Sequence, residues 1–123
     1  MGLDHHRVSK TVSGALSGPG GVALVVKIFA GLPGVTHTPA RRGLFSKSPE
    51  RIQIGDWRYE LASDGRLRVA HLVHGIVIAE ESLDAAVVGP HISRALGQVV
   101  NQYGETILPS IAAALEALSA SNG

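Results

Sequence analysis

The sequence has no cysteine among its 123 residues, which excludes disulfide bonds, thiolate zinc sites and cysteine nucleophiles. Charge of one sign is also scarce: charged residues make up 17% of the chain and the formal net charge is +1. That balance gives no reason to expect nucleic acid as a partner. No apolar run is long enough for a membrane span, and the N-terminal stretch lacks the order of a signal peptide. We therefore expect a cytoplasmic protein.

Hydrophobic residues account for 45% of the chain, which is enough to form a packed core. The length suits one compact domain, so we expect residues 1–123 to form a single small domain. Apolar side chains over residues 4–17 recur at helical spacing, and Asp4 is a suitable N-cap. Residues 20–34 are apolar at nearly every position, so periodicity does not separate a buried helix from a strand. We interpret this segment as a helix, with a strand over 22–29 as the alternative.

Residues 33–50 contain three prolines and two glycines among polar residues. This composition is typical of a long connection, and such connections in small domains are often functional. Arg41, Arg42 and Lys47 make it basic, so these three side chains are candidate ligands for an anion. A solvated loop is the simpler interpretation, because no recognition helix or aromatic stacking platform accompanies them.

The stretch 51–79 has the pattern of a β-hairpin with Ser63-Asp64-Gly65 at its tip. A two-residue loop would mix polar and apolar side chains on each face, whereas a three-residue loop with Gly65 in a G1 bulge would separate them. We therefore predict the longer loop. The pairs that it predicts are Leu61 with Leu67, Tyr59 with Val69, Trp57 with His71, and Glu60 with Arg68 on the other face. Beyond Gly75 the run "IVIA" is apolar on both faces, so we expect it to be covered on both sides, by helices or by a partner subunit.

The rest of the chain has helical patterns. A short turn over 82–88 is expected to be capped by Ser82, and a helix is expected to begin at Pro90 and end at Gly104. A second helix follows, with Pro109 tolerable only near its first turn. The fold class that we predict is therefore α+β: an antiparallel hairpin, with 22–29 as an optional third strand, packed against three or four helices.

Two histidines, His71 and His74, resemble an HxxH metal motif. On a strand, residues three apart point to opposite faces, so these two cannot converge on one ion. We predict no metal site and no cofactor. The candidate ligand-binding residues are Trp57, His71, His74 and His91. Partly buried histidines held by hydrogen bonds are the simpler interpretation of the same pattern.

Glu80 and Glu81 follow the predicted hairpin directly. One of them could pair with His74 or His91 as an acid–base dyad. No neighbouring motif supplies a nucleophile or an oxyanion hole, so we assign no catalytic residue and favour a non-enzymatic protein. Solvated acids at the start of a helix are the simpler interpretation.

Three segments carry a resemblance to a known group of proteins: "RIQIGDWRYEL…DGRLRVAHLVHGIVIAEE", "VGPHISRALGQVV" and "ILPSIAAALEAL". They resemble a family of small uncharacterised actinobacterial proteins that is described as a domain of unknown function. The resemblance covers the chain from about Gly20 onward. It implies no activity, cofactor or catalytic residue.

Three hypotheses for the function follow. The first is a non-enzymatic protein-interaction module that self-associates or joins a protein partner, because the apolar content is high for so small a domain. The second is a carrier of a small apolar ligand between hairpin and helices, in a pocket lined by residues such as Ile76, Ile78, Leu96 and Val100. The third is an enzyme that uses at least three convergent side chains from the set His71, His74, His91, Glu80 and Glu81. We rank them in that order.

Overall fold

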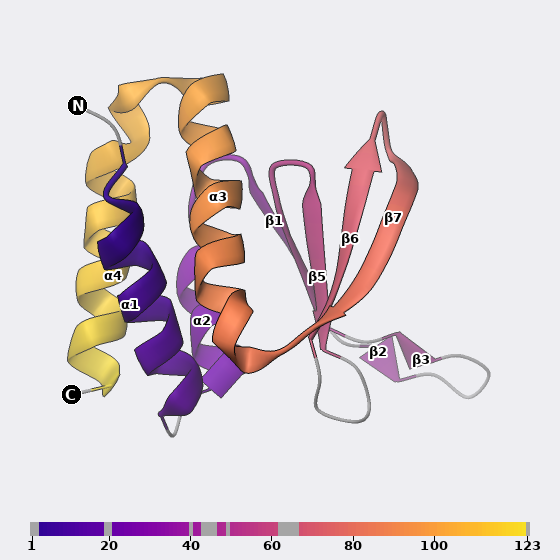
Figure 1. The fold of residues 1–123 in the computed structure, drawn as a ribbon, viewed down its shortest axis with the longest axis horizontal. Coiled ribbons are helices and arrows are strands. Elements are labelled where there is room, and N and C mark those ends of the chain that lie inside the picture. Colours follow the sequence, from indigo (N-terminus) through magenta and orange to yellow (C-terminus); the bar gives the residue numbers. More distant parts are fainter. Residues whose placement is uncertain are drawn as a thin grey trace.

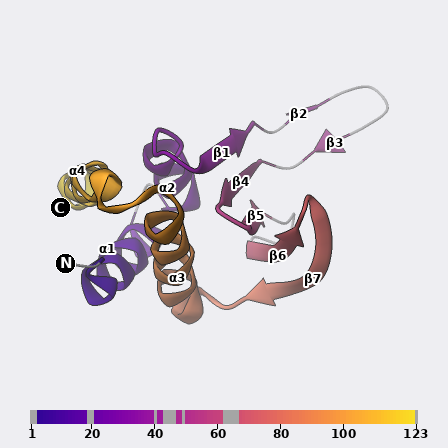
Figure 2. The same ribbon diagram turned by 90° about the horizontal axis from the view of Figure 1, so that it is seen from above.

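The structure is a computed structural model, and it describes residues 3–18, 21–39, 41–42, 47–48, 50–61 and 67–122. Within these ranges, helices form one layer and a curved antiparallel sheet forms the other, as Figure 1 shows. Figure 2 shows all the helices on the same side of the sheet. The predicted α+β class is therefore confirmed. None of the described helices has both the length and the apolar content needed to cross a membrane.

Two helices precede the sheet. The first, α1 (His5–Ser17), begins as predicted, because the side chain of Asp4 accepts a hydrogen bond of 3.0 Å from the backbone N–H of Arg7. The second, α2 (Gly21–Phe29), shows that the ambiguous apolar segment is a helix and not a third strand. Its buried residues are Val25, Val26 and Phe29, and this spacing puts them on one stripe of the helix facing the core.

The helices after the sheet differ from the prediction at one boundary. The long helix α3 (Ala85–Tyr103) follows Asp84 directly and contains Pro90, whereas Ser82 belongs to the preceding strand. The expected cap at Ser82 and the expected start at Pro90 are both wrong. Pro90 removes one backbone hydrogen bond, but it lies on the exposed side of the helix.

The C-terminal end of α3 agrees with the prediction. Gly104, with φ +87°, ends the helix, since a glycine adopts this conformation without strain. A short 3-10 turn, η1 (Glu105–Ile107), leads into α4 (Leu108–Asn122). Pro109 falls in the first turn of α4, where its missing N–H has no partner to lose.

The described sheet has five antiparallel strands in the order β1-β4-β5-β6-β7, and a separate ribbon pairs β2 with β3. The strands are β1 (Val35–Thr38), β2 (Arg41–Arg42), β3 (Lys47–Ser48), β4 (Arg51–Ile54), β5 (Trp57–Leu61), β6 (Leu67–Val73) and β7 (Ile76–Leu83). The prediction of a hairpin with an optional third strand therefore gave too few strands. The structure also places β1, β2 and β3 inside the expected 33–50 connection.

Two tight turns explain the extra strands. Gly55 has φ +59°, and the chain reverses there between β4 and β5. His74 and Gly75 have φ of +53° and +79°, the pair of positive values that a two-residue I′ turn requires between β6 and β7. Each turn takes up only two residues, and the apolar pattern continues directly beyond it.

The predicted register between β5 and β6 is confirmed. Trp57 pairs with His71, Tyr59 with Val69, Glu60 with Arg68 and Leu61 with Leu67. This register places Tyr59 and Val69 in the core and leaves Arg68 exposed. The expected bulge at Gly65 lies outside the described residues.

The expected covering of the "IVIA" run by the helices of the same chain is wrong. In β7 every residue except Leu83 is exposed, and Figure 2 shows the end of the β6–β7 hairpin curving away from the helices. β7 is also an edge strand, with β6 on one side only. The apolar side chains that we expected to be covered on both faces therefore lie at the surface of a single chain.

Candidate functional site

Two histidines and two aromatic side chains meet where α3 crosses β5. The ring of His71 stacks on Trp57 with centroids 4.2 Å apart and planes 11° apart. His91, from α3, meets Trp57 edge-on at 4.7 Å and Tyr59 edge-on at 5.4 Å. We call Trp57, Tyr59, His71 and His91 the aromatic–histidine cluster. Offset stacks and edge-on contacts of this kind are the favoured geometries of aromatic pairs.

His91 is the best-buried histidine of this cluster, with 7% of its surface exposed. A hydrogen bond of 2.7 Å joins its Nδ1 to the hydroxyl of Tyr59, which is 2% exposed. Burial lowers the pKa of His91, the charge of Arg94 lowers it further, and Glu81 opposes both effects. Burial likewise raises the pKa of Tyr59 well above its usual range. Both shifts fit a neutral pair in which the hydroxyl of Tyr59 donates a hydrogen bond to Nδ1 of His91.

An open groove lies beside this cluster. It has a volume of about 180 Å³ and is lined by Trp57, Val69, His71, Ala79, Glu80 and Glu81. The floor is therefore apolar and aromatic, and the β7 side carries two carboxylates. Among the described residues, no three histidine or acidic side chains stand close enough to hold a metal ion. With this lining, the groove can offer an apolar and aromatic surface with two carboxylates to a ligand.

The structure brings three of the four predicted ligand-binding residues together and places the fourth apart from them. Trp57, His71 and His91 converge as one cluster, whereas His74 lies in the β6–β7 turn with an exposed side chain. Tyr59 was predicted only as a strand residue, and its bond to His91 joins residues 32 apart in the chain. Gln98, also missed, accepts a hydrogen bond of 3.1 Å from the Nε1 of Trp57. No local pattern could have indicated either contact.

The predicted anion-binding residues lie on the small ribbon. The backbones of Arg41 and Arg42 form β2, and Lys47 in β3 pairs with Arg42. The side chains of all three fall outside the described part of the structure. The anion site is therefore still a prediction.

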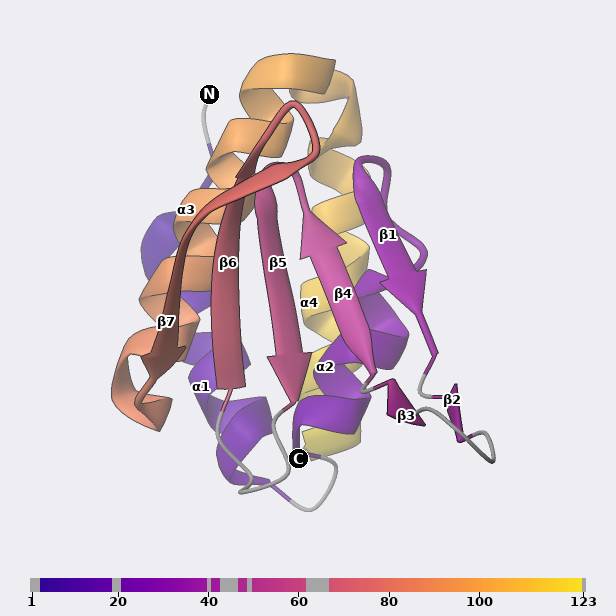
Figure 3. The ribbon, with the colours of Figure 1, turned by 90° about the vertical axis from the view of Figure 1, so that its right-hand side faces the viewer.

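A second surface stands out at the end of the β6–β7 hairpin. Its exposed fractions are 39% for Val73, 67% for Ile76, 38% for Val77 and 58% for Ile78. We call these four residues the apolar tip. Only Val87 and Tyr103 are comparably exposed large apolar side chains in the described part of the chain. Figure 3 shows the end of the hairpin bending over the open face of the sheet, away from the helices.

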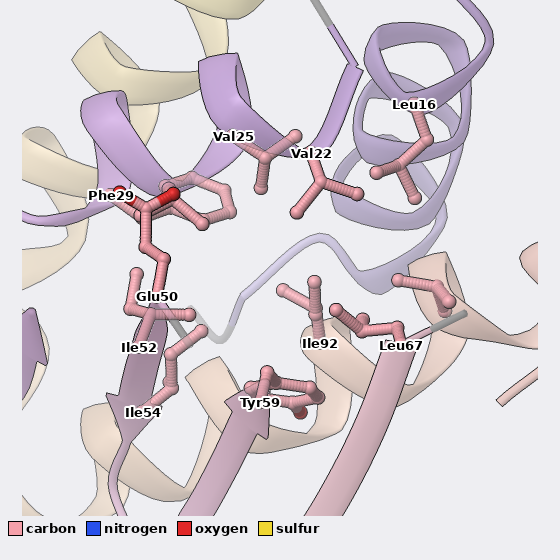
Figure 4. Close-up of a pocket in the computed structure, with 12 residues that line it drawn as sticks. Leu16, Val22, Val25, Phe29, Glu50, Ile52, Ile54, Tyr59, Leu67 and Ile92 are labelled. Atoms are coloured by element: carbon pink, nitrogen blue, oxygen red, sulfur yellow. The ribbon is translucent and has the colours of Figure 1, made fainter. Parts of the chain in front are cut away.

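A small hollow lies between the sheet and the helices, where a carrier would hold its ligand. Figure 4 shows apolar residues of α1, α2 and the sheet, such as Leu16, Phe29 and Ile54, pointing into it. Its volume of about 20 Å³ is room for roughly one water molecule. The lining predicted for a carrier is not assembled, because Ile76 and Ile78 are exposed on β7 while Leu96, on α3, is fully buried.

The comparisons with known proteins agree with the predicted resemblance to an uncharacterised family. No curated protein and no solved structure matches the chain. The actinobacterial source that the resemblance suggested stays a prediction. One family model matches residues 1–120, so the chain belongs to the family described as Domain of unknown function (DUF5073).

Proposed function

We propose that the protein is a non-enzymatic interaction module that associates with itself through the β6–β7 hairpin. The apolar tip is the observation that carries this proposal. Its exposed valine and isoleucine side chains gather on one hairpin instead of being scattered over the surface. A contiguous exposed apolar patch on a small domain usually marks an interaction site.

The position of the tip on an edge strand strengthens the proposal. Among the described strands β7 pairs with β6 alone, so its other side presents backbone N–H and C=O groups without a ladder partner there. Natural proteins usually protect such edges with charge, proline or short length. Ile76, Val77 and Ile78 provide none of these protections. An apolar free edge of this kind is suited to β-strand addition by a partner.

The aromatic–histidine cluster supports a structural role better than a catalytic one. Three of its polar atoms are engaged within the fold: the indole N–H of Trp57 with Gln98, and the hydroxyl of Tyr59 with Nδ1 of His91. The burial of His91 also favours its neutral form. These contacts anchor α3 to the sheet and so hold β6 and β7 in position beside it.

Sedimentation velocity over a range of concentrations tests the proposal. We expect the wild-type chain to show a concentration-dependent dimer, and Ile78→Ser to weaken it. Loss of the apolar contact should cost about 1–2 kcal/mol per copy, and each dimer contains two copies. Val87→Ser is the matched control, because Val87 is 47% exposed but lies on α3 outside the tip. A wild-type chain that stays monomeric at several hundred micromolar would contradict the proposal, as would equal effects of the two substitutions.

A further inference from the structure

We infer that the partner of β7 is β7 of a second copy, paired antiparallel with Val77 on the two-fold axis. This inference rests on the proposed function and names its partner and register. In this arrangement Ile76 of one copy lies opposite Ile78 of the other, and each Val77 faces its own counterpart. The two sheets then continue into each other across the axis, which is the isologous contact that a symmetric dimer requires.

β7 offers the better of the two free edges of the described sheet. The opposite edge strand, β1, is short and is flanked by Pro33 and Pro39. Proline supplies no N–H for a ladder, and short strands limit pairing. The segment Ile76–Ile78 carries no proline and no charge. We therefore expect edge-to-edge association to use β7 and not β1.

A β-bulge limits the segment that can pair. His71 pairs with Ala79 and Leu72 with Val77, so Ile78 is the extra residue on β7. A bulge bends its strand and increases the local twist. It separates Ile76 and Val77, next to the turn, from the acidic half of the strand at Glu80 and Glu81. The regular part of this apolar edge is therefore Ile76–Val77, and Ile78 contributes an apolar side chain at the bulge.

The charges around Val77 are complementary under a two-fold axis. The sequence "HGIVIAE" has His74 three residues before Val77 and Glu80 three residues after it. When two such segments run antiparallel with Val77 at the centre, His74 of each copy comes near Glu80 of the other. Both side chains are exposed, and no ion pair of either is seen among the described residues. Opposite charges across a strand pair stabilise it, so the segment matches a second copy of itself once the imidazole of His74 is protonated.

The same charges disfavour a longer register. If Ala79 were at the centre, Ile78 would face Glu80 of the second copy, and the carboxylates of Glu80 and Glu81 from both chains would gather around the axis. Like charges close together across strands are destabilising. A short ladder also buries less than the roughly 800 Å² per partner of a standard interface, so we expect a weak dimer.

A scan of single cysteines tests the register directly, because the wild-type chain has no cysteine to interfere. The variants are Ile76→Cys, Val77→Cys, Ile78→Cys and Ala79→Cys, each oxidised mildly at high protein concentration. Residues opposite each other in antiparallel strands have Cα atoms about 4.5–5.5 Å apart, within the range that a disulfide spans. The two copies of Ile76 would be offset from each other by two residues along the strands, which puts their Cα atoms about 8 Å apart, too far for a disulfide.

We expect Val77→Cys to cross-link at least about tenfold faster than the other three variants. An equimolar mixture of Ile76→Cys and Ile78→Cys should cross-link between the two variants. A maximum at Ile78 or Ala79, or equally slow reaction at all four positions, would overturn the inferred register. Sedimentation of the wild-type chain separates the two claims: a dimer without a maximum at Val77 refutes the register alone, and a monomer refutes the proposed function.

A charge exchange gives an independent test. In a buffer acidic enough to protonate His74, each of His74→Glu and Glu80→Lys should weaken the dimer by roughly 2- to 30-fold, since two symmetric pairs are lost and each contributes on the order of 0.2–1 kcal/mol. The double variant His74→Glu/Glu80→Lys should recover the lost affinity, because it restores opposite charges at the two facing positions. Glu116→Lys, on the exposed side of α4, is the control for net charge. A double variant that is weaker than both single variants would contradict the pairing.

Discussion

The hydrogen bond between Tyr59 and His91 gives the most specific prediction about stability. Tyr59→Phe removes the hydroxyl that lies 2.7 Å from Nδ1 of His91 and leaves that nitrogen without its partner in a site that is 7% exposed. A buried polar atom that loses its partner costs about 1–3 kcal/mol. For a chain of this length, that corresponds to a fall in Tm of roughly 3–10 °C.

A double-mutant cycle isolates this bond. His91→Phe leaves the tyrosine hydroxyl unpaired, and the double variant Tyr59→Phe/His91→Phe removes both polar groups. Replacing both partners by apolar groups can be nearly neutral, so the two losses should be less than additive, with a coupling of about 1 kcal/mol or more. Urea unfolding followed by the fluorescence of Trp57, the single tryptophan, measures all four proteins. Additive losses, or a loss below about 0.3 kcal/mol for Tyr59→Phe, would refute this account of the cluster.

Three further predictions concern the same fold. Because burial lowers the pKa of His91 below that of an unfolded histidine, about 6.5, the unfolded chain binds the proton more readily. The free energy of unfolding should therefore fall as the pH drops below about 6.5. Urea titrations at about pH 7.5 and 5.5 measure this fall, and we expect it to be smaller for His91→Phe than for the wild-type chain. Equal falls in the two proteins would contradict this prediction. Gly89→Ala should destabilise the fold by about 1–3 kcal/mol, because the added Cβ would lie 2.6 Å from the carbonyl oxygen of Ser9 on α1. This loss should exceed the gain from the better helix propensity of alanine. A higher Tm in a thermal melt would disprove that close packing. Asp4→Ala should cost about 1 kcal/mol through loss of the α1 cap, and an unchanged urea midpoint would show that the cap contributes nothing.

Local side-chain patterns were sufficient to predict the pairing of β5 with β6. Alternation placed Tyr59 opposite Val69, and the Glu60–Arg68 pair set the polar face, so only one register separated the two faces. The same register predicted that Trp57 lies opposite His71, as the structure shows. Register is strongly specified wherever one face of a strand pair is buried, which explains why this part of the candidate site could be predicted.

The turns and the covering of β7 could not be predicted in the same way. His74-Gly75 interrupts an apolar run by two residues only, and the apolar pattern resumes directly at Ile76, so periodicity alone does not show the reversal. An apolar strand also has the same pattern whether its own helices or another chain covers it. The bond from Tyr59 to His91 depends on how α3 docks against the sheet, which is a tertiary contact between distant segments.

Amide hydrogen exchange at two protein concentrations tests the central claim most directly, because it reports association and its location together. At a few micromolar, the edge amides of Ile76–Ile78 that face away from β6 should exchange as freely as other exposed edge groups. At several hundred micromolar, we predict slower exchange in this segment, while the amides of the opposite edge strand β1 stay unchanged. Exchange in Ile76–Ile78 that does not depend on concentration, or protection that appears only elsewhere on the chain, would contradict association through β7.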